Sequence, residues 1–197
     1  ERGTTCIAET YWQGSSRQWN LPNAISLSRA VAGVAVPLWW LGGTHVLFLA
    51  VVYAGLSDWL DGWLARRQGI VTPLGAVIDP LADKCFTNPF LLGLAITSGS
   101  VWLSVLFVVN LLYDIDNTYQ RRFDIAAAMR GVRAPATKPV TLLSKTKTAV
   151  LFGLMIVALY PSLVSFVAPD ELAMVSLGLV LASWGLNRAA TFRRYFL

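Results

Sequence analysis

The chain has 197 residues, of which 55% are apolar, 14% are charged and eight are tryptophan. Its formal net charge is +5, and its basic residues are unevenly distributed along the sequence. This composition excludes an ordinary soluble domain and favours an all-α, polytopic membrane protein.

The N-terminal segment, residues 1–22, carries three aromatic residues among polar ones, Tyr11, Trp12 and Trp19. It is either a segment lying in the lipid headgroup layer or an unstructured leader. No basic stretch followed by an apolar one opens the chain, so we expect no cleavable signal peptide. Asn23 is expected to cap the first helix.

The remainder, residues 23–197, is expected to form one domain of six transmembrane helices. Six apolar stretches approach the ~20 residues that cross a hydrocarbon core as a helix. They are residues 24–41, 44–66, 75–98, 101–119, 142–159 and 172–192.

The connections between these helices differ in charge. Those after the first, third and fifth predicted helices contain no Lys or Arg, and all 16 basic residues lie on the other side or in helices approaching it. By the positive-inside rule we expect both termini in the cytoplasm and a multi-pass protein of the cell membrane.

Four aspartates lie in the second and third predicted helices: Asp58, Asp61, Asp79 and Asp83. An unpaired charge at bilayer depth costs at least ~3 kcal/mol, so these carboxylates need a cavity, a counter-charge or a metal. Asp58 and Asp61 share a helix face, and Asp79 and Asp83 stack one turn apart. The short connection makes the two helices antiparallel neighbours, so all four carboxylates are expected to converge near the cytoplasmic face.

Oxygen ligands gathered in this way suit Mg²⁺, Mn²⁺ or Ca²⁺ better than a soft metal, and two divalent ions are the natural number for four carboxylates. The alternative is structural ion pairing with Arg66, Arg67 or Lys84, but three cations cannot neutralise four carboxylates.

The spacing Asp58-x2-Asp61-Gly62-x2-Ala65-Arg66-x8-Gly75-x3-Asp79-x3-Asp83 resembles the motif of the CDP-alcohol phosphotransferase family at every fixed position. A Leu-Pro-Asn start to the first helix and a Ser-Lys-Thr-Lys-Thr segment in the fifth extend the resemblance. It implies an integral membrane enzyme, homodimeric, that uses an alcohol hydroxyl to displace CMP from a CDP-linked lipid such as CDP-diacylglycerol.

The resemblance also implies roles for individual residues. Asp58, Asp61 and Asp79 would hold two Mg²⁺ or Mn²⁺ ions, and Asp83 would act as general base while also touching a metal. The CDP group would be bordered by Gly62, Ala65, Arg66 and Gly75.

For the acceptor, Lys145 and Lys147 resemble a stretch of phosphatidylglycerophosphate synthases in which cations receive a phosphorylated alcohol. Arg121, Arg29 and Arg188 are further candidates, and glycerol 3-phosphate is the expected acceptor.

One departure leaves other acceptors open, because Tyr113-Asp114 stands where those synthases carry Arg-Glu. The alternatives are an inositol phosphate, phosphatidylglycerol or another polyol. Asp114 and Asp116 either bind acceptor hydroxyls or pair with Arg121 and Lys147.

Two other classes of protein are weighed. A divalent-cation transporter also places carboxylates in the membrane, but it would line a path through the bilayer rather than gather them near one face. A non-catalytic lipid-binding protein need not retain all four aspartates. The expected partners are membrane lipids and the two substrates, with no nucleic acid.

Overall fold

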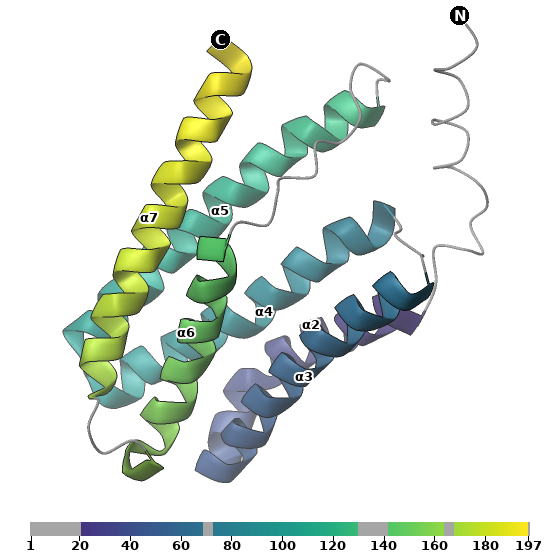
Figure 1. The fold of residues 1–197 in the computed structure, drawn as a ribbon. Helices are drawn as coiled ribbons and strands as arrows, with labels where there is room; N and C mark the ends of the chain where they lie inside the picture. The colour runs from purple at the N-terminus through teal and green to yellow at the C-terminus, as the bar shows by residue number, and fades with distance from the viewer. Residues whose placement is uncertain (1–20, 69–72, 130–141, 164–167, 197) are drawn as a thin grey trace, which may run out of the picture. The chain divides into compact units, whose positions relative to one another are not determined.

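The computed structural model describes residues 21–68, 73–129, 142–163 and 168–196, and within these ranges all secondary structure is helical (Figure 1). The expected headgroup-layer segment, residues 1–22, therefore lies almost entirely outside the described residues. The chain divides into two compact units, Glu1–Phe90 and Leu91–Leu197, with the boundary inside one helix.

All six predicted helices are confirmed. Their bounds are α2 Leu21–Trp39, α3 Thr44–Gln68, α4 Pro73–Ser98, α5 Val101–Met129, α6 Leu142–Leu159 and α7 Pro169–Phe196, with short 3₁₀ turns η2 Trp40–Gly42 and η3 Pro161–Leu163.

Two helix ends differ from the prediction. The α2 helix already includes Leu21, so Asn23 lies inside it and the predicted cap is wrong; Pro22 is tolerated because a first-turn residue needs no backbone donor. The α5 helix continues to Met129, ten residues beyond its predicted end at residue 119, so Arg121 belongs to a helix rather than to a connection.

Four helical segments are long and apolar enough to cross a membrane. Length and hydropathy qualify Leu21–Gly42, Thr44–Leu64, Val101–Gln120 and Pro169–Phe192 as candidate spans. The described parts of α4 and α6 do not qualify, and α4 contains Asp79, Asp83, Lys84 and two internal prolines. The chain is thus a helical protein with several candidate spans, and the predicted count of six is not confirmed.

In the first unit, α2 and α3 run antiparallel and side by side (Figure 1). The face of α2 that is buried includes Ser26, Arg29, Gly33 and Val36, which recur at the three- and four-residue spacing of one helix face. Two of these four positions are polar, so this face buries a polar layer as well as an apolar one.

Gly33 marks a close approach of α2 to α4. A Cβ atom added at Gly33 would lie 2.4 Å from the carbonyl oxygen of Cys85, closer than any real side chain allows. After Cys85 along α4, the rings of Phe86 and Phe90 stack with centroids 5.8 Å apart, and the Trp40 ring meets Phe90 edge-on with centroids 5.4 Å apart. The glycine lets α4 come near the polar layer of α2.

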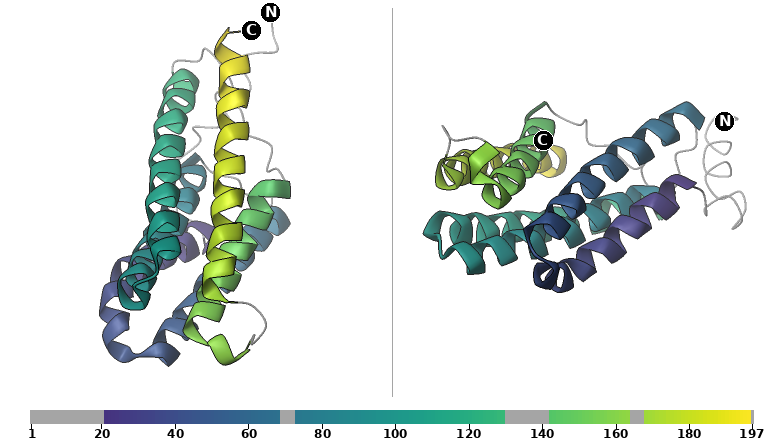
Figure 2. Two further views of the ribbon diagram at one scale, coloured as in Figure 1. Left: turned by 90° about the vertical axis from the view of Figure 1, so that its left-hand side faces the viewer. Right: turned by 90° about the horizontal axis from the view of Figure 1, so that it is seen from below.

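In the second unit, α7 lies beside both α5 and α6 (Figure 2). The turn between α4 and α5 passes through Gly99, whose φ of 64° suits a residue without a side chain. Next to it, the Ser100 hydroxyl donates to Asp170 Oδ1 at 2.5 Å and ties the start of α5 to the first turn of α7.

Substituting Gly33 with alanine is predicted to destabilise the protein by about 1–3 kcal/mol, because the new methyl group meets rigid backbone rather than a movable side chain. Thermal unfolding in detergent, followed by the monodisperse fraction, measures the effect. Gly153→Ala in α6 is the matched control, since a Cβ there meets nothing within 4 Å. Equal melting temperatures for the two variants would contradict the close approach.

Candidate functional site

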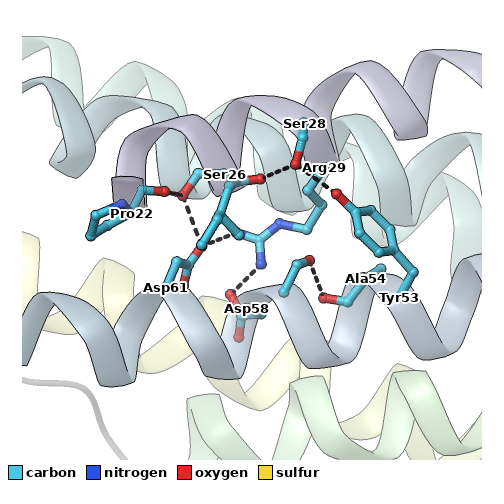
Figure 3. A network of polar contacts seen from close by, with 10 residues as sticks. Pro22, Ser26, Ser28, Arg29, Tyr53, Ala54, Asp58 and Asp61 are labelled. Carbon is cyan, nitrogen blue, oxygen red and sulfur yellow. Dashed lines mark hydrogen bonds and ion pairs between the residues drawn. The ribbon is translucent and has the colours of Figure 1, made fainter. Parts of the chain in front are cut away.

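A buried guanidinium joins α2 to the acidic face of α3. Arg29 is 1% exposed, and its Nη1 donates to Asp58 Oδ1 at 2.7 Å, while Nη2 lies 3.5 Å from Asp61 Oδ2 (Figure 3). Because Asp58 and Asp61 are three residues apart on one helix face, one arginine reaches both. Sequence analysis placed Arg29 with the acceptor, and the structure gives it these two aspartates as partners.

Ser26, one turn before Arg29, completes the contact with Asp61. Its hydroxyl lies 2.8 Å from Asp61 Oδ2 and 3.1 Å from the Pro22 carbonyl oxygen. One proton serves either acceptor, so the serine supports a carboxylate that is otherwise buried. A second pair of hydroxyls, Ser28 and Tyr53, lies 2.6 Å apart, with Ser28 two residues beyond Ser26, and joins the same two helices. Sequence analysis missed Ser26, although it lies three residues before Arg29 on the same face.

The α4 helix brings a third carboxylate to this cluster. Asp79 interacts electrostatically with Arg29, Asp58 and Asp61. Asp83 follows one turn later on α4 and is half-buried, as is Lys84. The expected convergence is therefore seen for Asp58, Asp61 and Asp79, which we call the acidic cluster.

The donor set of the acidic cluster fits a hard divalent cation. Within the described residues, the ion pairs of Asp58 and Asp61 both come from Arg29, so one positive charge faces two carboxylates there. The Asp58 side chain is 55% exposed, and the buried Nε and Nη2 of Arg29 have no hydrogen-bond partner within the described residues. Carboxylate oxygens with unmatched negative charge are ligands that Mg²⁺ and Mn²⁺ prefer.

The described residues do not, however, hold three or more Asp, Glu, His or Cys side chains within ligating distance of a single point. Two of the carboxylates instead close on Arg29. The alternative partner Arg67 lies with its guanidinium 5.0 Å from the Trp63 ring. The metal site stays a prediction, supported by donor chemistry and charge.

The four residues expected at the CDP group lie on the same two helices. Gly62 directly follows Asp61 on α3 and is half-buried. Ala65 and Arg66 belong to the last turns of α3 and Gly75 to the first turn of α4, but their surroundings lie outside the described residues. Their predicted role is untested.

The acceptor candidates of the second unit have different partners. Arg188 of α7 donates to Asp116 Oδ1 of α5 at 2.5 Å, and Asp116 Oδ2 also accepts from Trp184 Nε1 and Gln120 Nε2, each at 2.8 Å. Asp116 thus pairs with Arg188, and within the described residues it makes no ion pair with Lys147. The side chain of Arg121 lies outside the described residues.

Both lysine candidates are on α6. Lys145 is exposed, and Lys147 is half-buried with its Nζ 4.5 Å from the centre of the Tyr113 ring. Asp114, the neighbour of Tyr113, is buried and accepts from Asn110 Nδ2 at 3.2 Å.

The chain is similar to known proteins over most of its length. A family model described as CDP-alcohol phosphatidyltransferase matches residues 19–185. A CDP-diacylglycerol–glycerol-3-phosphate 3-phosphatidyltransferase of Aquifex aeolicus is 30% identical over 84% of this chain and 92% of its own. The enzyme of that name from Pseudomonas fluorescens is 29% identical over 75% of this chain and 76% of its own.

Two plant relatives match over a smaller part of their length. The chloroplastic CDP-diacylglycerol–glycerol-3-phosphate 3-phosphatidyltransferase 1 of Oryza sativa is 42% identical over 40% of this chain, and the match spans 24% of that protein. A CMP-forming cardiolipin synthase of the same organism is 28% identical over 84% of this chain and 53% of its own. The chain thus spans about a quarter and about half of these two relatives.

Replacing Arg29 with methionine is predicted to cost about 3–5 kcal/mol of stability, because it leaves the buried Asp61 without its counter-charge. Arg188→Met is the matched control and is expected to cost about 1 kcal/mol or less, since the Arg188 side chain is 61% exposed and Asp116 keeps two other donors. Thermal unfolding in detergent compares the two. Equal losses would show that Arg29 is no more important to the fold than a surface arginine.

Proposed function

The chain belongs to the CDP-alcohol phosphatidyltransferase family, and on this premise we propose that it transfers the phosphatidyl group of CDP-diacylglycerol to glycerol 3-phosphate with release of CMP. The observation that carries the proposal is the acidic cluster, in which three of the four motif aspartates, Asp58, Asp61 and Asp79, come together from α3 and α4 beside Arg29. Two bacterial proteins named for this reaction are about 30% identical over three quarters or more of the chain.

For the membrane, we propose that all six helices span the bilayer, with both termini in the cytoplasm and the acidic cluster near the cytoplasmic side. The support is the absence of Lys and Arg from the connections at residues 42–43, 99–100 and 160–171, in keeping with the positive-inside rule. A homodimer is proposed on the family resemblance alone.

The acidic cluster of Asp58, Asp61 and Asp79, together with Asp83 beside it, would hold two Mg²⁺ or Mn²⁺ ions. When bound, the ions supply positive charge beside the pyrophosphate and the leaving CMP. Arg29 keeps Asp58 and Asp61 together by compensating part of their mutual repulsion. Gly62 offers backbone without a side chain next to these carboxylates, which leaves room for the nucleotide.

Asp83 is the proposed general base. Its carboxylate takes the proton of the acceptor hydroxyl, the hydroxyl oxygen forms a bond to the phosphorus of the phosphatidyl group, and the bond from that phosphorus to CMP breaks. The position of Asp83, one turn beyond Asp79 on α4, supports a role beside the cluster rather than within it.

Lys145 and Lys147 are the proposed cations for the phosphate of the acceptor. The structure supports them over Arg29 and Arg188, because both arginines already pair with aspartates. A phosphate monoester carries up to two negative charges and is matched by two ammonium groups.

Asp83→Asn is predicted to lower kcat for CMP release by about 10²–10⁴-fold, the usual range for a lost general base, while Mn²⁺ binding persists. Asp58→Asn is predicted to weaken Mn²⁺ binding itself. CMP release from CDP-diacylglycerol measures the first property, and electron paramagnetic resonance of Mn²⁺ measures the second. Asp170→Asn, at the start of α7, is the control carboxylate and should change neither.

These roles would be contradicted if Asp83→Asn lost Mn²⁺ binding while Asp58→Asn kept it. If the wild-type protein with Mg²⁺ or Mn²⁺ released no CMP in the presence of any acceptor, the proposed activity itself would be wrong.

A panel of acceptors tests the second substrate. Glycerol 3-phosphate is predicted to give the highest kcat/KM, ahead of inositol phosphate, phosphatidylglycerol and glycerol, because its small phosphomonoester suits two adjacent lysines. Glycerol should fall by at least about tenfold through loss of a charged hydrogen-bonding group. A higher kcat/KM with phosphatidylglycerol would instead indicate cardiolipin synthesis.

A further inference from the structure

Tyr113 of α5 and Lys147 of α6 form a pair that the proposed chemistry does not yet use. The Nζ atom of Lys147 lies 4.5 Å from the centre of the Tyr113 ring, within the ~6 Å over which the ring attracts a cation. Tyr113 is 5% exposed and Lys147 is half-buried, so water screens the attraction only in part. The ring is therefore a specific partner for the ammonium group.

The ring itself is braced at its hydroxyl. The Tyr113 oxygen accepts from Asn187 Nδ2 of α7 at 3.2 Å, and Asn117 Nδ2 of α5 lies 3.5 Å away. Side chains of α5 and α7 thus hold the Tyr113 phenol in place, and its ring faces Lys147 of α6. A braced ring restricts a side chain that otherwise has four rotatable bonds.

The partners of Lys147 differ from those of Arg188 in the same unit. Arg188 is held by the Asp116 carboxylate, whereas within the described residues Lys147 makes no ion pair. An aromatic face orients an ammonium group without neutralising its charge, and it leaves donors directed elsewhere. Lys147 is therefore ordered and remains available to an anion.

We propose that Tyr113 is a positioning residue for acceptor binding: its ring holds the Lys147 ammonium group in place to receive the phosphate monoester of the acceptor. This inference rests on the proposed function for the identity of the acceptor, but the pairing of ring and lysine can be tested apart from it.

The first test separates the ring from its hydroxyl. Tyr113→Leu removes the ring and is expected to raise the KM for glycerol 3-phosphate about tenfold, the size of one partly desolvated cation–π contact, with the KM for CDP-diacylglycerol unchanged. Tyr113→Phe keeps the ring and is expected to stay within about threefold of the wild type. Lys147→Met should raise the acceptor KM at least as far, and adding Tyr113→Leu to it should raise it no further.

The second test does not depend on activity. Reductive methylation of the purified protein, followed by mass spectrometry, reports how accessible each lysine is. Labelling of Lys147 is expected to be slow in the wild type and Tyr113→Phe, and about fivefold faster in Tyr113→Leu, because a cation–π contact of this strength is lost. Lys145, exposed on the same helix, is the matched control and should label equally in all three proteins.

The outcomes are distinguishable. Faster labelling of Lys147 in Tyr113→Leu alone supports the pairing even if glycerol 3-phosphate is not the acceptor. Unchanged labelling, or equal acceptor KM values for Tyr113→Leu and the wild type, overturns it. Faster labelling of Lys145 as well would show general unfolding and would also count against a specific contact. In that case the Lys147→Met variant, which keeps the Tyr113 ring, still tests the lysine through the acceptor KM.

Discussion

The packing of the first unit depends on the compensation of carboxylates of α3 by Arg29 of α2. Asp58 and Asp61 come from α3 and Asp79 from α4, and Arg29 of α2 lies among them. Burying such a guanidinium is costly unless carboxylates surround it, and burying the carboxylates is costly without it. Each partner thus lowers the cost of burying the other. Ser26 adds a hydrogen bond to Asp61, and Asp58 remains in contact with water because its side chain is 55% exposed.

Packing and charge support each other along α2. Gly33 lies one turn beyond Arg29 and lets α4 approach to backbone contact at Cys85. Asp79 lies six residues before Cys85, and the two helices run the same way, so a close approach at Gly33 also brings Asp79 toward Arg29. A larger residue at position 33 would move α4 outward and weaken the electrostatic contact as well as the apolar one. A steric feature that carries no charge therefore contributes to the geometry of the acidic cluster.

The helices and the grouping of Asp58 with Asp61 could be predicted from the sequence, but the ion-pair partners of the aspartates could not. Apolar length located all six helices to within a few residues at most ends, and helical spacing placed Asp58 with Asp61. Spacing within a helix says nothing of the register between two helices, so neither Arg29 on Asp58 nor Arg188 on Asp116 was foreseen. Hydropathy also ended α5 too early, because the polar residues Gln120, Arg121 and Arg122 interrupt the apolar stretch while the helix continues through them.

The cations of the chain are held in two different ways. An arginine forms several directed hydrogen bonds to a carboxylate, which suits Arg29 and Arg188 to joining helices: α2 to α3 in the first unit and α5 to α7 in the second. A lysine is a compact charge on a flexible chain, and Lys147 contacts a ring that does not neutralise it, with no carboxylate paired to it within the described residues. Had Lys147 faced Asp114 or Asp116 instead, an incoming phosphate would have had to displace a carboxylate before it could bind. The Tyr113 ring thus orients the Lys147 ammonium group without a carboxylate that an incoming anion would have to displace.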